Sequence, residues 1–341
     1  MVVENLFIKW SCGKMAFFDS TKKFLYYLKK ADIVLHAPGG PSIGDTYFDD
    51  EITYLRTYDL VASLKIPYMF YAPSMGPFDK KERNKWRKKI LNNACAIVLR
   101  DPISAKYVRK LVDNKEVYQT LDSAFQHDID IKENKRKLNN YKFLQEFLNR
   151  HEYCVGVTIT DLLWHPVHSK DDKLIQNIRN SFTTFLDELV EKGYGIVFIP
   201  QLYGDGNDYE LMEQYMRDKN NYFILPDDDD RYDSYFQQYL ISCLYAVIGM
   251  RYHSNIFSAK MSTPFVSISY EQKMQGFMEK MGLEEYCIKI NELSVNVLEN
   301  KFEKLSKEHN NYKKYLRKKH DEMRDASYET TKILKNIIEK I

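Results

Sequence analysis

Side chains that can bind an anion and move a proton follow two apolar runs in the second half of the chain. The first run ends at Gly249, and the second covers residues 264–268. The side chains are Arg251, His253 and Ser254 after the first run and Tyr270 and Lys273 after the second. Two cations beside an imidazole suit a small anionic substrate whose reaction needs a proton transfer. Such residues at strand ends are also common structural residues, so both interpretations stay open.

The two apolar runs are the elements that must position these side chains. Each is short and bounded by turn residues, which predicts a buried strand. If the strands are parallel neighbours, their following residues meet at one edge of the sheet, where ligands bind in open α/β folds. Ser254 is predicted to cap a helix over residues 255–261.

The first half of the chain repeats this strand-and-helix alternation, which predicts a parallel sheet covered by helices. Strands are expected at residues 32–36, 67–71, 94–99 and 116–119. Arg100 follows the third of them, and a glycine-rich loop over residues 37–45 follows the first. Glycines allow free amides to cradle an anion, but this loop lacks a dinucleotide or P-loop spacing. A tight strand-to-helix turn is the alternative interpretation.

The pattern stops in a segment rich in lysine and asparagine and then restarts with a strand near Cys154. We therefore expect an α/β protein with two analogous domains and a boundary in that segment. The expected divisions are residues 1–127, a linking segment 128–152, a second domain 153–298 that carries Arg251, His253 and Lys273, and a charged helical tail 299–341.

Composition excludes several classes of protein. The 341 residues include 50 basic and 48 acidic side chains, so the net charge of +2 gives no general attraction to nucleic acid. The five cysteines are scattered without metal-ligand spacing, which favours a reduced cytoplasmic compartment. No apolar run is long enough to span a membrane, and no signal peptide is recognised. The acidic run at 227–230 could hold a metal ion, although a solvated turn is the favoured interpretation.

Six motifs, in this order and at these distances, resemble the polysaccharide pyruvyl transferase family over roughly residues 30 to 285. The matching segments are Ala37–Asp45, Ser74–Pro77, Arg100–Ser104, Leu121–Phe125, Ile248–Ser254 and Ser269–Lys273. Two departures are visible. The Asn-x-Gly-Asp loop usual in the family is not found before Ala31, and Pro41 stands in the glycine loop where a more flexible residue is common.

The resemblance implies a glycosyltransferase B-like fold, in which two Rossmann-like domains face a cleft. It also implies transfer of the pyruvyl group of phosphoenolpyruvate onto a sugar of a cell-surface polysaccharide or its lipid-linked precursor, usually as a ketal. Phosphate leaves, and phosphoenolpyruvate is a donor substrate, so no cofactor or metal is expected. The acceptor sugar and the oligomeric state stay open.

The resemblance also implies roles for individual residues. Arg100, Arg251 and Lys273 are expected to bind the phosphate and carboxylate of the donor, and His253 to move the proton. Because Arg100 lies in the first domain, domain closure is expected to complete the site. The expected substrate-binding residues are Gly39, Gly40, Ser42, Asp45, Ser74, Gly76, Ser254 and Tyr270.

Two other functions remain open for such a chain. One is a nucleotide-sugar-dependent glycosyltransferase of the same fold, and the other is a glycan-binding relative without turnover. The basic segment 313–319 in the tail predicts peripheral contact with the inner membrane face, with a solvated helix face as the alternative.

Overall fold

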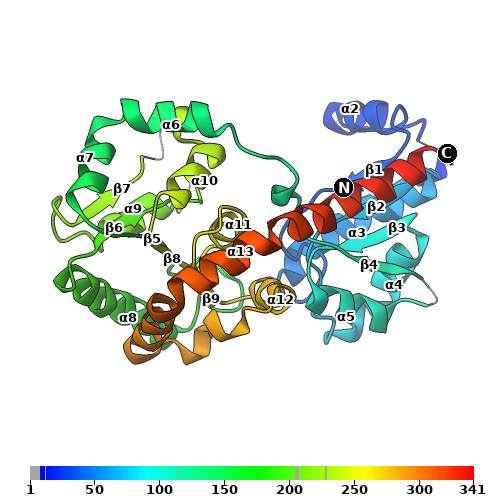
Figure 1. Cartoon of the computed structure of the whole chain (residues 1–341). Coiled ribbons are helices and arrows are strands. Elements are labelled where there is room, and N and C mark those ends of the chain that lie inside the picture. The colour runs from blue at the N-terminus through cyan, green and yellow to red at the C-terminus, as the bar shows by residue number, and fades with distance from the viewer. Residues whose placement is uncertain (1–7, 12, 114, 204–206, 227–228) are drawn as a thin grey trace. The chain divides into compact units, whose positions relative to one another are not determined.

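The computed structural model describes residues 8–11, 13–113, 115–203, 207–226 and 229–341 (Figure 1). Its contacts divide the chain into two units. Unit 1 comprises Met1–Ser123 with Asp325–Ile341, and unit 2 comprises Ala124–Arg324. The division after Ser123 falls close to the expected domain end at residue 127. The expected tail, however, is shared between both units.

Unit 1 is built on a parallel four-stranded sheet with the order β1-β2-β3-β4. The strands are β1 (Val34–His36), β2 (Tyr68–Tyr71), β3 (Ala96–Leu99) and β4 (Val117–Gln119). The helices are α2 (Asp19–Leu28), α3 (Phe48–Ser63), α4 (Asn84–Asn93) and α5 (Pro102–Leu111), with short 3-10 turns η1 (Lys81–Arg83) and η2 (Ser123–Phe125). All four residues of β3 are buried, as expected for a parallel sheet covered by helices. The predicted strand-and-helix alternation of the first half is therefore confirmed.

Local sequence explains where α5 begins and how α3 and α4 are joined. The carboxylate of Asp101 accepts the backbone N–H of Ser104, and Pro102 takes the first helical turn. Between α3 and α4, the fully buried Arg87 donates from Nε to the equally buried Glu51 at 2.7 Å. The two charges compensate each other, so neither is left unpaired inside the unit.

Unit 2 contains a parallel six-stranded sheet with the order β10-β9-β8-β5-β6-β7. The strands are β5 (Cys154–Thr158), β6 (Gly195–Phe198), β7 (Tyr222–Ile224), β8 (Ala246–Gly249), β9 (Phe265–Ser269) and β10 (Cys287–Lys289). Strands β8 and β9 pair directly and in parallel. The prediction that the residues following them share one edge of a sheet is thus confirmed.

The helices of unit 2 begin inside the segment expected to link the domains. They are α6 (Ile131–Asn140), α7 (Lys142–Arg150), α8 (Asp172–Glu191), α9 (Asp208–Glu213), α10 (Ser234–Ser242), α11 (Tyr252–Lys260) and α12 (Gln272–Met281), with 3-10 turns η3 (Asp230–Tyr232), η4 (Glu284–Tyr286) and η5 (Ile290–Glu292). Asp130 caps α6 through the N–H of Glu133, so most of this polar segment is helical and belongs to unit 2.

The predicted cap of the helix after β8 is wrong. Helix α11 begins at Tyr252, and the capping position is taken by Arg251, which makes no side-chain cap. The Ser254 hydroxyl instead lies inside the first turn, where it donates to the carbonyl of Arg251 at 2.6 Å and contacts Thr158 Oγ1 at 2.8 Å. A serine in a first turn can satisfy a backbone carbonyl in this way, which competes with the capping role.

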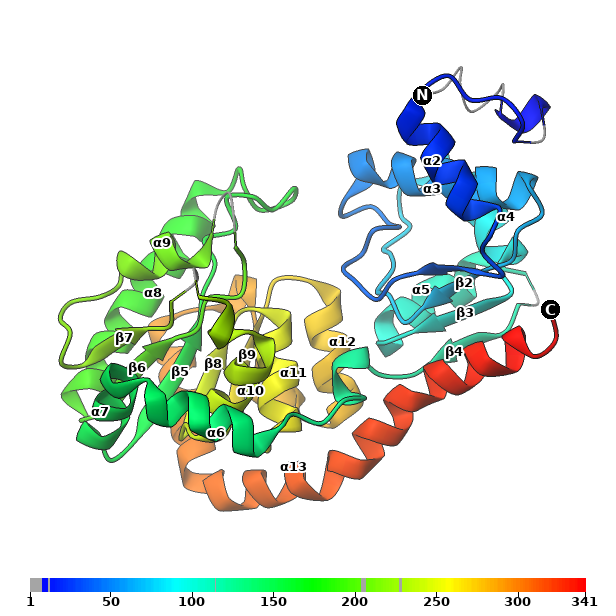
Figure 2. The same ribbon diagram turned by 90° about the horizontal axis from the view of Figure 1, so that it is seen from above.

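The expected tail is helix α13 (Val295–Ile338), whose 44 residues contribute to both units. Its buried side chains in unit 2 include Leu298, Leu305 and Leu316. Its last turns lie against the unit 1 sheet, as Figure 2 shows beside β4, where Ile333, Leu334 and Ile337 pack on Met69, Ala96 and Val98. In the part of the chain that the structure describes, neither α13 nor another helix is long and apolar enough to cross a membrane.

Candidate functional site

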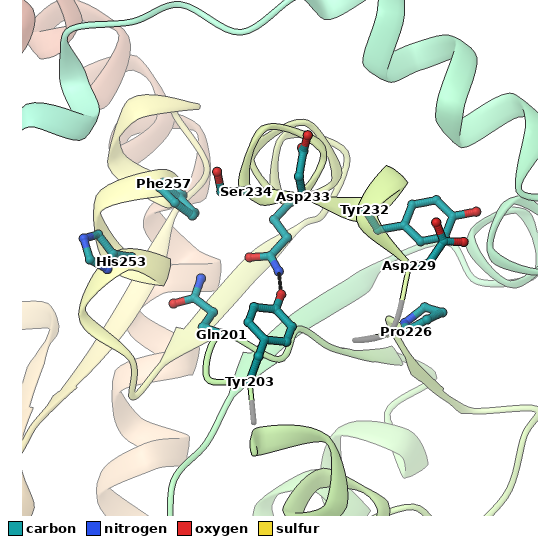
Figure 3. A pocket seen from close by; sticks show the side chains of 10 residues that line it. Gln201, Tyr203, Pro226, Asp229, Tyr232, Asp233, Ser234, His253 and Phe257 are labelled. Carbon is teal, nitrogen blue, oxygen red and sulfur yellow. Dashed lines mark hydrogen bonds between the residues drawn. The ribbon is translucent and has the colours of Figure 1, made fainter. Parts of the chain in front are cut away.

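A cavity of about 500 Å³ lies in unit 2 at the carboxyl edge of the sheet (Figure 3). Its lining residues are Gln201, Tyr203, Pro226, Asp229, Tyr232, Asp233, Ser234, Gln237, His253 and Phe257. Gln201 follows β6 and His253 follows β8, and only β5 separates these two strands. The predicted proton carrier therefore faces a cavity in the place where open α/β sheets bind ligands.

The amide of Gln201 was not among the residues singled out from the sequence. Both of its polar atoms are buried, and neither has a hydrogen-bond partner. Its neighbour Gln237 is different, because its Nε2 donates to the carbonyl of Pro200 at 2.9 Å. It also donates to the Tyr203 hydroxyl at 2.7 Å, the bond that is dashed in Figure 3. A buried amide without a partner is costly, so Gln201 is a candidate ligand contact. In the sequence, its position directly after a predicted strand was the feature that could have identified Gln201 as a candidate.

Arg251 is buried and held by a carboxylate that the sequence did not point to. Its Nε donates to Asp208 Oδ2 at 3.1 Å, its Nη2 also contacts that carboxylate, and its guanidinium lies 5.3 Å from the Trp164 ring centre. Burial alone would lower the pKa of Arg251, but Asp208 beside it raises that pKa. Burial raises the pKa of Tyr270, whose hydroxyl bonds to Arg251, so the phenol stays protonated.

Lys273 is also paired with a buried carboxylate. Its Nζ lies 2.5 Å from Oε2 of the buried Glu271, whose Oε1 lies 3.1 Å from His165 Nε2. His165 stacks on His168, with ring centres 4.6 Å apart. Arg251 thus lies next to an aromatic ring, and Lys273 shares the carboxylate of Glu271 with the His165 imidazole. Arg251 and Lys273 are not among the residues that line the cavity of His253.

In unit 1, Arg100 is brought together with two of the predicted substrate-binding residues. Its Nη1 lies 2.5 Å from Asp122, its Nε donates to Ser74 Oγ at 3.0 Å, and its Nη2 donates to the carbonyl of Gly39. Arg100 is only 2% exposed. Each of the three predicted donor-binding cations therefore has a carboxylate partner.

The glycine loop borders a second cavity, of about 850 Å³, in unit 1. Gly39, Gly40 and Ser42 line it together with His36 and one face of α3. His36 Nδ1 lies 2.9 Å from the Tyr58 hydroxyl and its Nε2 lies 2.7 Å from Ser42 Oγ. Burial lowers the pKa of His36 to about 4, so its ring is neutral at physiological pH.

Two further predicted residues hold loops in place. Asp45 Oδ1 accepts from Arg87 Nη2 at 2.8 Å, and its Oδ2 accepts the backbone N–H of Lys80. Gly76 has a φ of +88°, and a Cβ there would lie 2.7 Å from the Tyr107 ring, so the position requires glycine. Asp45 and Gly76 lie outside the linings of both cavities.

Among the residues that the structure describes, the acidic run 227–230 forms no metal site. Asp227 and Asp228 lie outside the described residues. Among the residues that are described, no group of three or more His, Cys, Asp or Glu side chains is arranged to hold a metal ion.

Comparison with known proteins identifies relatives of the sequence and of the fold. The family model described as polysaccharide pyruvyl transferase matches residues 5–272. The amylovoran biosynthesis protein AmsJ of Erwinia amylovora is 23% identical over 282 residues, which are 80% of this chain and 65% of that protein. The chain therefore spans less than two thirds of the length of this relative.

Solved structures confirm the predicted glycosyltransferase B-like α/β fold. A UDP-GlcNAc 2-epimerase from Neisseria meningitidis has a TM-score of 0.57 at 12% identity, covering 93% of this chain and 79% of its own. An α,α-trehalose 6-phosphate synthase from Burkholderia multivorans has a TM-score of 0.56 at 11% identity, covering 98% and 81%. At this identity the likeness concerns the fold alone.

Proposed function

Because this chain belongs to the polysaccharide pyruvyl transferase family, we propose that it transfers the pyruvyl group of phosphoenolpyruvate onto a sugar. The sugar belongs to a cell-surface polysaccharide or to its lipid-linked precursor, and the product is a pyruvate ketal. The reaction takes place in the cytoplasm, and no cofactor besides the donor substrate is part of the proposal. The observation that carries it is the cavity of His253 at the sheet edge where two carboxylate-paired cations, Arg251 and Lys273, follow β8 and β9.

The donor is assigned to the cations rather than to the cavity. Phosphoenolpyruvate carries a phosphate and a carboxylate, which Arg251 and Lys273 can bind through charge-assisted hydrogen bonds. The cavity is lined by the carboxylates of Asp229 and Asp233, which would repel so anionic a ligand. Arg100 is proposed to bind the donor only because its segment resembles a family motif.

The acceptor sugar is assigned to the cavity of His253. Tyrosine rings, carboxylates and amides line this cavity, and such groups contact the apolar faces and the hydroxyls of sugars. The buried amide of Gln201 can donate to one hydroxyl and accept from another. Gly39, Gly40 and Ser42 remain proposed substrate contacts in the second cavity.

The chemistry needs two proton movements. Two sugar hydroxyl oxygens form bonds to C2 of phosphoenolpyruvate, and the bond from C2 to the phosphate oxygen breaks. One hydroxyl proton is delivered to the methylene carbon, which becomes a methyl group, and the other leaves with phosphate. His253 is the proposed carrier, because an imidazole can accept and return a proton near neutral pH.

Ligand-induced thermal stabilisation tests the proposal. At ~100 times its dissociation constant, phosphoenolpyruvate should stabilise the folded protein by about 2.7 kcal/mol. UDP and UDP-sugars are the controls. Stabilisation by UDP without any effect of millimolar phosphoenolpyruvate would instead favour the glycosyltransferase. Binding of glycans without phosphate release from the donor would favour a relative without turnover.

A further inference from the structure

The surface of unit 1 around helix α2 concentrates exposed hydrophobic side chains. Between residues 10 and 27 they are Trp10 (77% exposed), Met15 (44%), Phe17 (52%), Phe18 (58%), Phe24 (43%), Tyr26 (56%) and Tyr27 (61%). The described residues contain no other such group within so short a stretch of chain. A large exposed apolar patch on a protein surface marks a binding site for another protein or for a membrane.

The two sides of α2 have different roles. Leu25 and Leu28 are buried and belong to the core of unit 1. At 100° per residue, Lys23, Tyr26 and Tyr27 project from the opposite side of α2, and Lys30 follows the end of the helix; all four are exposed. The Lys30 ammonium lies 4.1 Å from the centre of the Tyr26 ring, which in turn packs edge-on against Tyr27 at 5.4 Å. The outward side therefore combines aromatic rings with positive charge.

Charge decides which partner fits this surface. The exposed charged residues of segment 13–32 are Lys14, Lys22, Lys23, Lys29 and Lys30 against Asp19 and Asp32. Asp19 is paired with Lys22 at 2.9 Å, so the excess is positive. We propose that α2 and the described residues 13–18 before it bind the surface of an anionic phospholipid bilayer. The lysines contact lipid phosphates, while the aromatic side chains enter the interface between head groups and acyl chains.

The basic segment of α13 lacks the exposed aromatic rings that accompany the positive charge of α2. Tyr312 and Leu316 are buried in unit 2, and the Tyr315 hydroxyl donates to the carbonyl of Met281. The exposed neighbours Lys314 and Lys318 thus provide charge without exposed aromatic rings. This makes them a matched control for charge alone.

Flotation of the full chain with lipid vesicles tests the proposal. The wild type should float with vesicles of phosphatidylcholine mixed with phosphatidylglycerol, and much less with phosphatidylcholine alone. Lys23→Glu/Lys30→Glu should reduce vesicle binding about tenfold or more, since each basic side chain at the surface contributes separately. Tyr26→Ser/Tyr27→Ser should also reduce it, whereas Lys314→Glu/Lys318→Glu should not. All these side chains are exposed, so melting temperatures should match.

Three results would overturn the proposal. The wild type could fail to float with anionic vesicles, or the two lysine-to-glutamate variants could lose binding equally. Light scattering could also show a dimer that Tyr26→Ser/Tyr27→Ser dissociates, without vesicle binding, which would assign this surface to a second copy of the chain. The proposal does not depend on the reaction, because vesicle binding is measured without donor or acceptor.

Discussion

At the residue scale, the cations expected to bind the donor are all paired with carboxylates. Arg251 is held by Asp208, Lys273 by Glu271 and Arg100 by Asp122. A buried guanidinium or ammonium needs such compensation, because an unpaired charge would destabilise the fold. The pairs also fix where the remaining N–H groups point. If the donor binds at this site as proposed, its binding depends on oriented N–H groups more than on a surplus of positive charge.

His253 provides the test of proton transfer. His253→Gln should retain donor binding, because the proposal assigns the phosphate and the carboxylate to the cations. Turnover should fall about 10²–10⁴-fold, the usual contribution of a general acid–base group. Phosphate release measures the rate, and calorimetry measures the affinity for phosphoenolpyruvate. Near-normal turnover of His253→Gln would assign the histidine a structural role instead.

Arg251→Lys is the matched variant for donor binding. It keeps a positive charge beside the buried Asp208, which Arg251→Ala would leave uncompensated. Lysine cannot reproduce the planar guanidinium, so donor affinity should fall together with turnover. An unchanged dissociation constant for phosphoenolpyruvate would remove Arg251 from the donor site.

Gln201 and Gln237 should respond in opposite ways to the same substitution. Gln201→Leu removes a buried amide that has no hydrogen-bond partner, so stability should stay constant or rise while KM for the acceptor increases. Gln237→Leu removes the donor to Pro200 and Tyr203, so stability should fall by about 1–3 kcal/mol. Urea unfolding and acceptor kinetics separate the two effects. A loss of stability in Gln201→Leu equal to that of Gln237→Leu would contradict the assignment.

At the scale of elements, β1 and the glycine loop are joined by one neutral histidine. The folded state lowers the pKa of His36 from 6.5 to about 4 through burial. Between these pH values the unfolded chain binds the proton and the folded chain does not. The stability contribution is therefore complete above about pH 6.5 and is lost as pH falls toward about 4, with a total of about 3 kcal/mol.

The pH dependence of His36→Gln isolates this contribution. The variant should lose less stability than the wild type between about pH 6.5 and about pH 4, because it has no imidazole to protonate. Urea unfolding of both proteins across this range gives the difference. Asp50 lines the same cavity, but it is present in both proteins, so its titration cancels. Parallel pH profiles would show that His36 is not the titrating group.

At the scale of the whole molecule, α13 is part of the architecture of both units. Its last turns reach the unit 1 sheet, where Thr330 contacts Thr120 at 2.8 Å and Thr331 contacts Tyr71 at 2.7 Å. Ser327 donates to the backbone carbonyl of Asp122, the residue that holds Arg100. This helix therefore also positions a predicted site residue. Membrane contact by its basic segment, the alternative to contact through α2, is tested by the Lys314→Glu/Lys318→Glu variant.

Removal of residues 325–341 should destabilise unit 1. The deletion exposes apolar surface on Met69, Ala96 and Val98 and removes the hydrogen bonds of Ser327 and Thr330. The expected loss is at least about 3 kcal/mol of unfolding free energy, measured by urea denaturation. Removal of residues 339–341 alone, which are exposed, is the control and should have little effect. Equal stability of the two truncated proteins would contradict the role of α13.

The sequence alone determined the local features of this protein. Apolar runs bounded by turn residues predicted the strands that precede Arg251 and Lys273, because burial in a parallel sheet selects such runs. The start of α5 is also a local feature, since Asp101 and Pro102 establish it within one helical turn. The order and spacing of the six motifs carried the resemblance to the family, and that resemblance predicted the glycosyltransferase B-like fold.

Only the tertiary structure decided which side chains meet. Asp208 lies far from Arg251 in the chain, and the parallel crossovers of unit 2 bring them together. Periodicity says nothing about such pairs, since it reports only which face of an element is buried. The burial of the Gln201 amide and the packing of α13 in both units have the same origin. They depend on long-range contacts, and no local pattern of residues records these contacts.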